Sequence, residues 1–160
     1  MMTTSSALQL ADLALVWETG SGDLTMIDTD LASDRGLETA VLLSLFTDRR
    51  AENDDVAPSG DDKDRRGWWA DELLPTEGDR YGSRLWLLDR SKRTDDVVLR
   101  AEEYVREALA WMLEDLVAES IDVGIEMNAT NLLIGVTLHR PSKDPVSLRF
   151  AHAWTELEGS

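Results

Sequence analysis

Cysteine is absent from this sequence of 160 residues. Without thiols the chain can form neither disulfide bonds nor thiolate metal sites. Basic residues are also scarce, because 16 Lys and Arg stand against 32 Asp and Glu, which gives a formal net charge of −16 at pH 7. Nucleic-acid binding and docking on anionic membranes both depend on Lys and Arg, so we expect neither function.

Long apolar runs are missing as well. No stretch approaches the roughly 18 consecutive apolar residues that a membrane-spanning helix requires. Residues 1–11 contain no basic residue and no long apolar run, so they are not expected to act as a secretory signal. We therefore expect the protein in the cytoplasm, or in a particle that is assembled there.

The composition is nevertheless that of a folded protein. Hydrophobic residues make up 42% of the chain, which is an ordinary globular value and predicts a single domain over residues 1–160. Tyr and Phe occur only twice each, whereas Trp occurs six times. Trp is enriched in buried anchors and in protein interfaces. The tryptophans therefore indicate either a surface that packs against protein partners or an ordinary core, and composition leaves both open.

The first half of the chain predicts a hairpin, a buried helix and a charged loop. Residues 1–10 are expected to be flexible. Residues 12–17 and 24–27 predict two short strands joined by a glycine-containing turn. Residues 36–47 predict a helix that is apolar on almost every side and should be covered all round, by the domain or by a partner. Residues 48–66 hold seven acids and five bases and predict an exposed loop.

The second half predicts a long helix followed by a sheet. Residues 83–89 are a short apolar segment whose periodicity does not distinguish helix from strand. Residues 94–117 follow the i, i+3, i+4, i+7 pattern of an amphipathic helix. Residues 121–127, 132–140 and 146–154 then alternate with period two and are joined by short turns, which predicts a three-stranded antiparallel meander. The fold class is therefore α+β.

The sequence contains no recognisable catalytic, cofactor-binding or metal-binding motif. Residues 62–67 begin like a calcium loop, but Arg66 and Leu73 stand where oxygen ligands are required. His139 and His152 lie on predicted strands with no nucleophile nearby, so we expect structural roles for both. We expect no cofactor, no metal and no enzymatic activity.

Five stretches, taken in order, resemble the baseplate wedge proteins of Mu-like contractile-tailed phages, which are related to the sheath-initiator proteins of contractile tails. The stretches are residues 12–17 (DLALVW), 36–50 (GLETAVLLSLFTDRR), 64–71 (DRRGWWAD), 82–88 (GSRLWLL) and 101–115 (AEEYVREALAWMLED). The likeness extends over about residues 12–154 and is most specific in the second and third stretches. It implies a structural protein of the virion tail baseplate, assembled in the host cytoplasm and present in six copies per baseplate.

The same resemblance implies the partners. Such proteins bind other baseplate wedge and hub proteins, and they offer a sheet edge to the tail sheath protein, so that main-chain hydrogen bonds join the two chains. Sheath initiators carry a Glu-Pro-Arg turn where the long helix ends. Here only Glu114 matches, because Asp115 and Leu116 replace the proline and the arginine. A role for that arginine is therefore not carried over to this chain.

Seven residues are candidates for a protein interface, and each also has a simpler interpretation. They are Arg49, Arg50, Trp68, Trp69, Arg84, Trp86 and Glu114. The two adjacent arginines could simply complement the negative end of the preceding helix. The tryptophans and Arg84 could pack over that helix, and Glu114 could be an ordinary surface acid. Two other functions remain open: a free acidic regulator or inhibitor, and a baseplate-associated hydrolase that uses two carboxylates.

Overall fold

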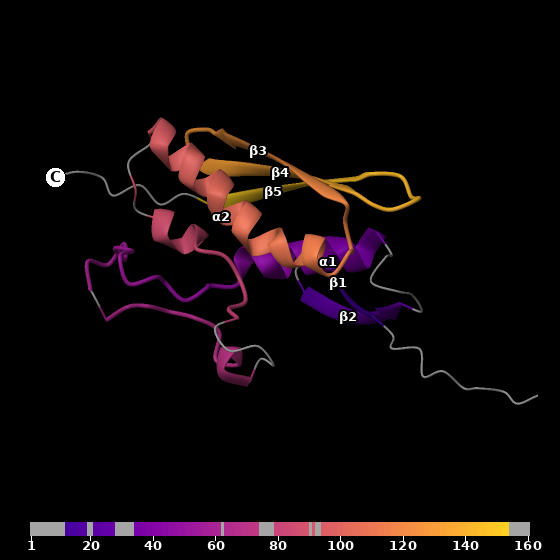
Figure 1. Cartoon of the computed structure of the whole chain (residues 1–160), viewed down its shortest axis with the longest axis horizontal. Coiled ribbons are helices and arrows are strands. Elements are labelled where there is room, and N and C mark those ends of the chain that lie inside the picture. Colours follow the sequence, from indigo (N-terminus) through magenta and orange to yellow (C-terminus); the bar gives the residue numbers. More distant parts are fainter. Residues whose placement is uncertain are drawn as a thin grey trace, which may run out of the picture. The chain divides into compact units, whose positions relative to one another are not determined.

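The structure is a computed structural model, and two helices and a three-stranded antiparallel sheet form the framework of its described part (Figure 1). This confirms the α+β class. The described residues are 12–18, 21–27, 34–61, 63–73, 79–89, 91 and 94–153. Residues 1–10, expected to be flexible, lie outside them. The chain divides into two compact units, residues 1–41 and 42–160.

The first unit contains two strands and the beginning of a helix. Strand β1 (Asp12–Glu18) pairs antiparallel with β2 (Ser21–Ile27), in a register that places Asp12 opposite Ile27 and Glu18 opposite Ser21. Helix α1 (Asp34–Phe46) starts in this unit and ends in the second.

The end of α1 is buried on one side only. Leu45 and Ser44 are buried, but Leu43 is 47% exposed and Phe46 is 38% exposed. The Phe46 ring lies against Phe150 of the sheet, with 6.0 Å between ring centroids. The chain itself therefore leaves part of the last turn uncovered, and the alternative that a partner covers this part stays a prediction.

Residues 47–91 connect the two helices with mainly irregular structure. Two backbone hydrogen bonds join the beginning of this segment to Ser83. Ser83 N donates to Thr47 O at 2.9 Å, and Arg49 N donates to Ser83 O at 2.9 Å. Gly82 precedes this contact with φ +99°, and a Cβ there would lie 2.3 Å from Thr47 O. Only glycine therefore fits at this close approach.

Two short 3-10 helices lie within the connection: η1 (Asp71–Leu73) and η2 (Leu85–Leu88). All four residues of η2 are buried, which explains why its continuous apolar run showed no period. Residues 48–66, expected as an exposed loop, are mostly exposed or half-buried, although Ala51 and Ala57 are buried.

Helix α2 (Asp95–Glu114) buries one face, as its apolar pattern predicts. It ends three residues earlier than expected. Leu116 adopts φ +58°, Leu116 N donates to Leu113 O at 3.3 Å, and Val117 N donates to Met112 O at 2.9 Å. These bonds form a Schellman motif, which caps the last carbonyls and reverses the chain into the sheet.

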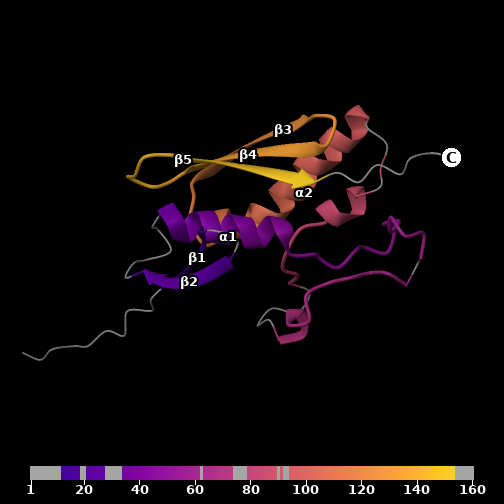
Figure 2. The ribbon, with the colours of Figure 1, turned by 180° about the vertical axis from the view of Figure 1, so that it is seen from behind.

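The sheet has the strand order β3 (Ser120–Met127), β4 (Asn131–His139), β5 (Val146–Ala153), and every pairing is antiparallel. This confirms the predicted meander, which Figure 2 shows from behind. On β4, Leu132, Ile134, Val136 and Leu138 are buried, and the residues between them are half-buried. Helix α2 contacts β3. Among the described helices, none is both long and apolar enough to cross a membrane.

Candidate protein interface

Arg84 lies at the centre of an ion-pair network that joins the irregular segment to α2. Its Nη1 is 3.0 Å from Asp55 Oδ2, its Nε donates to Glu107 Oε2 at 2.9 Å, and its guanidinium lies 4.6 Å from the centre of the Tyr104 ring. The Arg84 side chain is only 13% exposed. Burial lowers the pKa of Arg84, but the hydrogen bonds to Glu107 and Asp55 outweigh it and raise that pKa. Arg84 is therefore a permanently charged link inside the chain.

Trp86 is a core residue, with 2% of its surface exposed. Its indole Nε1 donates to the backbone oxygen of Arg49 at 2.8 Å. Arg66 lies over the face of the ring, with 4.5 Å from its guanidinium carbon to the ring centroid. Trp86 thus fixes the chain just after α1 rather than projecting from the surface.

The Arg49 side chain is also directed into the chain. Its Nη1 donates to Arg80 O at 3.0 Å, and its Nη2 lies 4.0 Å from Glu107 Oε1. Its Nε is buried and has no hydrogen-bond partner among the described residues. The predicted contact of Arg49 with another chain stays a prediction.

Trp68, Trp69 and Tyr81 form a surface aromatic cluster. The Trp68 ring centroid is 5.9 Å from that of Trp69 and 5.4 Å from that of Tyr81. Trp69 is 80% exposed. Arg50 borders this cluster, because its Cβ lies 3.0 Å from where a Cβ on Gly67 would be. Of the seven predicted residues, Arg50 and Trp69 are both exposed, as interface residues would be.

Glu114 is the last residue of α2 and is exposed. No basic residue lies in the last turn of the helix, and the acidic Asp115 follows directly. Leu116 is next and is 78% exposed. This helix end therefore combines negative charge with an exposed apolar side chain.

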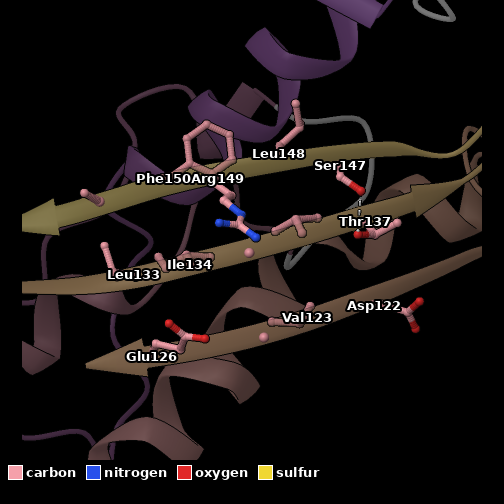
Figure 3. Close-up of a pocket in the computed structure, with 14 residues that line it drawn as sticks. Asp122, Val123, Glu126, Leu133, Ile134, Thr137, Ser147, Leu148, Arg149 and Phe150 are labelled. Atoms are coloured by element: carbon pink, nitrogen blue, oxygen red, sulfur yellow. Dashed lines mark hydrogen bonds between the residues drawn. The ribbon is translucent and has the colours of Figure 1, made fainter. Parts of the chain in front are cut away.

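The C-terminal sheet presents two kinds of surface. The outer edges of β3 and β5 are unpaired within the described residues. The face made by the exposed side chains of β3 and β5 and the half-buried ones of β4 is hollowed, with a cavity of about 700 Å³. Figure 3 shows the Arg149 side chain reaching from β5 toward β4 on this face. The hydroxyls of Thr137 and Ser147 are hydrogen-bonded at 3.0 Å beside it.

The structure gives both histidines a carboxylate partner, and their structural role stays a prediction. His139 Nε2 lies 2.8 Å from Asp122 Oδ2, and His152 Nε2 lies 2.9 Å from Asp89 Oδ1. Within the part of the chain that the structure describes, no group of three or more His, Asp or Glu residues is placed to hold a metal ion.

Several important residues were not found from the sequence. Asp55 and Glu107 are 29 and 23 residues from Arg84 along the chain, and no local pattern connects them. Gly124 and Gly135 lie on the less buried side of the alternating strands β3 and β4, and glycine inside a strand is a visible signal of a special backbone position.

Comparison with known proteins gives consistent matches. The family described as Phage protein GP46 matches residues 37–145. "Baseplate protein gp46" of Escherichia phage Mu is 48% identical over 103 residues, which cover 64% of this chain and 68% of that protein. "Mu-like prophage FluMu protein gp46" of Haemophilus influenzae is 38% identical over 114 residues, which cover 71% of this chain and 75% of that protein. The resemblance to Mu-like phage proteins is thereby confirmed, and the chain belongs to the Phage protein GP46 family.

Proposed function

We propose that this protein is a structural component of the baseplate of a contractile phage tail, where it acts as a wedge protein of the sheath-initiator type. The observation that carries this proposal is the 48% identity to a protein named as a baseplate protein of phage Mu. The exposed Trp69 and Arg50 support it, because Trp and Arg are the residue types that dominate protein interfaces. The partners are other wedge and hub proteins, in a baseplate with six copies of this chain.

The tail sheath protein attaches, in this proposal, to the free edge of β5. Asn128 N donates to Asn131 O at 3.0 Å. Hydrogen-bonded and non-hydrogen-bonded residue pairs alternate along antiparallel strands, so this bond determines toward which neighbouring strand each N–H group of the meander points. With the observed registers, the N–H groups of Ser147, Arg149 and Ala151 then point away from β4. A strand of another chain can pair with them by β-augmentation.

The role is structural rather than enzymatic. The half-buried carboxylates of Asp55 and Glu107 both bind Arg84, so they serve as its counter-ions and are not free to act as an acid and a base. The protein resides in the tail of the virion and assembles in the host cytoplasm. We also propose that residues 1–160 fold as one domain that includes the N-terminal hairpin.

Co-expression with the wedge, hub and sheath proteins of the same phage tests this function. Size exclusion with light scattering should show a defined complex that contains this chain. A stable monomer that joins none of these proteins would contradict the proposal and would favour the acidic regulator instead.

A proline substitution tests the edge. Ala151→Pro removes an N–H that points to the free edge and breaks no bond to β4, so the melting temperature should change little. Binding of the sheath protein should be lost, whereas wedge binding should persist. Ala151→Val keeps the N–H group and serves as the matched control. Sheath binding that survives in a folded Ala151→Pro variant would show that this edge is not used.

A further inference from the structure

Two glycines occupy strand positions where the chain itself does not require glycine. Gly124 on β3 and Gly135 on β4 lie directly opposite each other in the sheet. A Cβ on Gly124 would meet nothing within 4 Å, and a Cβ on Gly135 would meet only Gly124 O at 3.6 Å, which is ordinary contact. Alanine would fit at both positions and would favour the strand. Glycine inside a strand often marks a place where another backbone approaches closely.

The two paired glycines are followed, on the next strand β5, by a charged residue. Arg149 pairs with Gly135, so the row across the sheet is Gly124, Gly135, Arg149. The adjacent positions on β3, two residues to either side of Gly124, are Asp122 and Glu126. The hollow of about 700 Å³ is lined by residues of these rows, as Figure 3 shows. One margin of the face is therefore acidic, the other carries an arginine, and the centre is bare.

The charged groups are available for pairing. Arg149 and Glu126 make no ion pair with any described residue, and Asp122 pairs only with His139 among them. The acidic margin on β3 and the arginine on β5 lie on opposite sides of the face. Two copies of this face can therefore pair so that the arginine of each copy meets the acids of the other.

We propose that this face binds the same face of a second copy of the chain, with a two-fold axis that runs parallel to the strands and passes by Gly135. This rotation places β5 of each copy over β3 of the other. Arg149 then lies in the free space over Gly124 of the other copy, between Asp122 and Glu126, and the contact occurs twice. The two Gly135 residues meet at the axis, where the absence of side chains lets the strands approach.

The alternative axis, perpendicular to the strands, is disfavoured by charge. It would place β3 on β3 and bring the four carboxylates of Asp122 and Glu126 from the two copies together. Like charges at an interface oppose association. The strand-parallel axis is thus the arrangement that the charge pattern selects.

The size of the face and the net charge set the strength of the dimer. Three strands of this length present a footprint of about 25 by 15 Å, which belongs to the weak end of specific interfaces. The charge of −16 on each copy also opposes association. We therefore expect a concentration-dependent dimer that becomes stronger from low to physiological salt, because salt screens the long-range repulsion more than the contact pairs.

Sedimentation of the full-length chain alone tests the proposal, up to millimolar concentration and at physiological salt. The wild type should show a monomer–dimer equilibrium. Gly135→Val fills the hollow and should raise the dissociation constant at least tenfold while the melting temperature stays equal or rises. Arg149→Glu should weaken the dimer to a similar extent, and Glu126→Arg combined with Arg149→Glu should recover part of the affinity.

Arg100→Glu is the matched control, since it makes the same charge change at an exposed position of α2 and should leave the dimer intact. A monomer at every concentration would overturn the proposal. A dimer with unchanged affinity in the folded Arg149→Glu variant would also overturn it, because the contact would then lie elsewhere. The proposal goes beyond the baseplate function and does not depend on it, since no other protein enters the experiment.

Discussion

At the scale of single residues, arginine has two distinct uses in this chain. Arg84 is held between two carboxylates, whereas Arg50 and Arg149 are exposed. The sequence left open whether Arg84 contacts a partner or packs inside the chain, because Asp55 and Glu107 are far away along the chain. Local patterns report which face of a helix or strand is apolar, but they do not report which distant charges meet.

Arg84 should be more important for stability than an exposed arginine. Arg84→Met leaves Asp55 without its cation and leaves Glu107 with only Arg49, whose Nη2 is 4.0 Å away. Loss of one member of a buried ion pair typically costs about 3–5 kcal/mol. Because these side chains keep some contact with water, we expect a loss of about 2–3 kcal/mol in the free energy of unfolding, measured by urea denaturation.

Arg100→Met is the control for this measurement, because Arg100 is exposed on α2. Its effect should stay within about 0.5 kcal/mol. An equal loss in both variants would mean that the network around Arg84 contributes nothing specific.

At the scale of elements, the regular parts of the fold were predictable and the irregular parts were not. The 3.6-residue period of α2 and the two-residue period of β3, β4 and β5 each repeat over several turns or strand residues, so they identify the element. The segment of η2 is too short and too uniformly apolar to show a period. It follows directly after the hydrogen bonds that join Ser83 to Thr47 and Arg49, and sequence patterns do not reveal such distant contacts.

The end of α2 was misplaced because leucine is an unusual residue in a left-handed cap. Leu116 adopts φ +58°, a position that usually holds glycine. We predict that Leu116→Gly stabilises the protein by about 1 kcal/mol, since glycine adopts this conformation without steric cost. Thermal unfolding would register this as a higher melting temperature.

Leu99→Gly provides the opposite case, because Leu99 is an exposed leucine inside the same helix. Glycine there should destabilise the protein by about 1 kcal/mol. A destabilised Leu116→Gly variant would show that the leucine side chain makes a stabilising contact despite its exposure.

At the scale of the whole molecule, charge is the dominant property. Arg49, Arg65, Arg66, Arg80 and Arg84 all bind partners inside residues 47–107, so these cations are unavailable to balance the acids elsewhere. The composition left open whether the tryptophans form a surface for protein partners or an ordinary core. It could not locate the surfaces, because placing Trp86 inside and Trp69 outside requires the tertiary structure.

The net charge also predicts how salt affects the isolated chain. With −16 charges on 160 residues, self-repulsion opposes the compact state. Raising sodium chloride from about 10 mM to about 300 mM reduces the screening length to below 10 Å, so the melting temperature should rise. A melting temperature that falls over this range would mean that the internal ion pairs contribute more to stability than the repulsion removes.

The contrast between Trp69 and Trp86 has an optical consequence. The indole of Trp69 is 80% exposed, whereas that of Trp86 is 2% exposed. Covering Trp69 with another protein would shift its fluorescence to shorter wavelength and reduce quenching by acrylamide. Trp86 is already shielded and would contribute a constant background. Trp69 is thus a built-in spectroscopic probe at the aromatic cluster, and its response adds to the emission of the other five tryptophans.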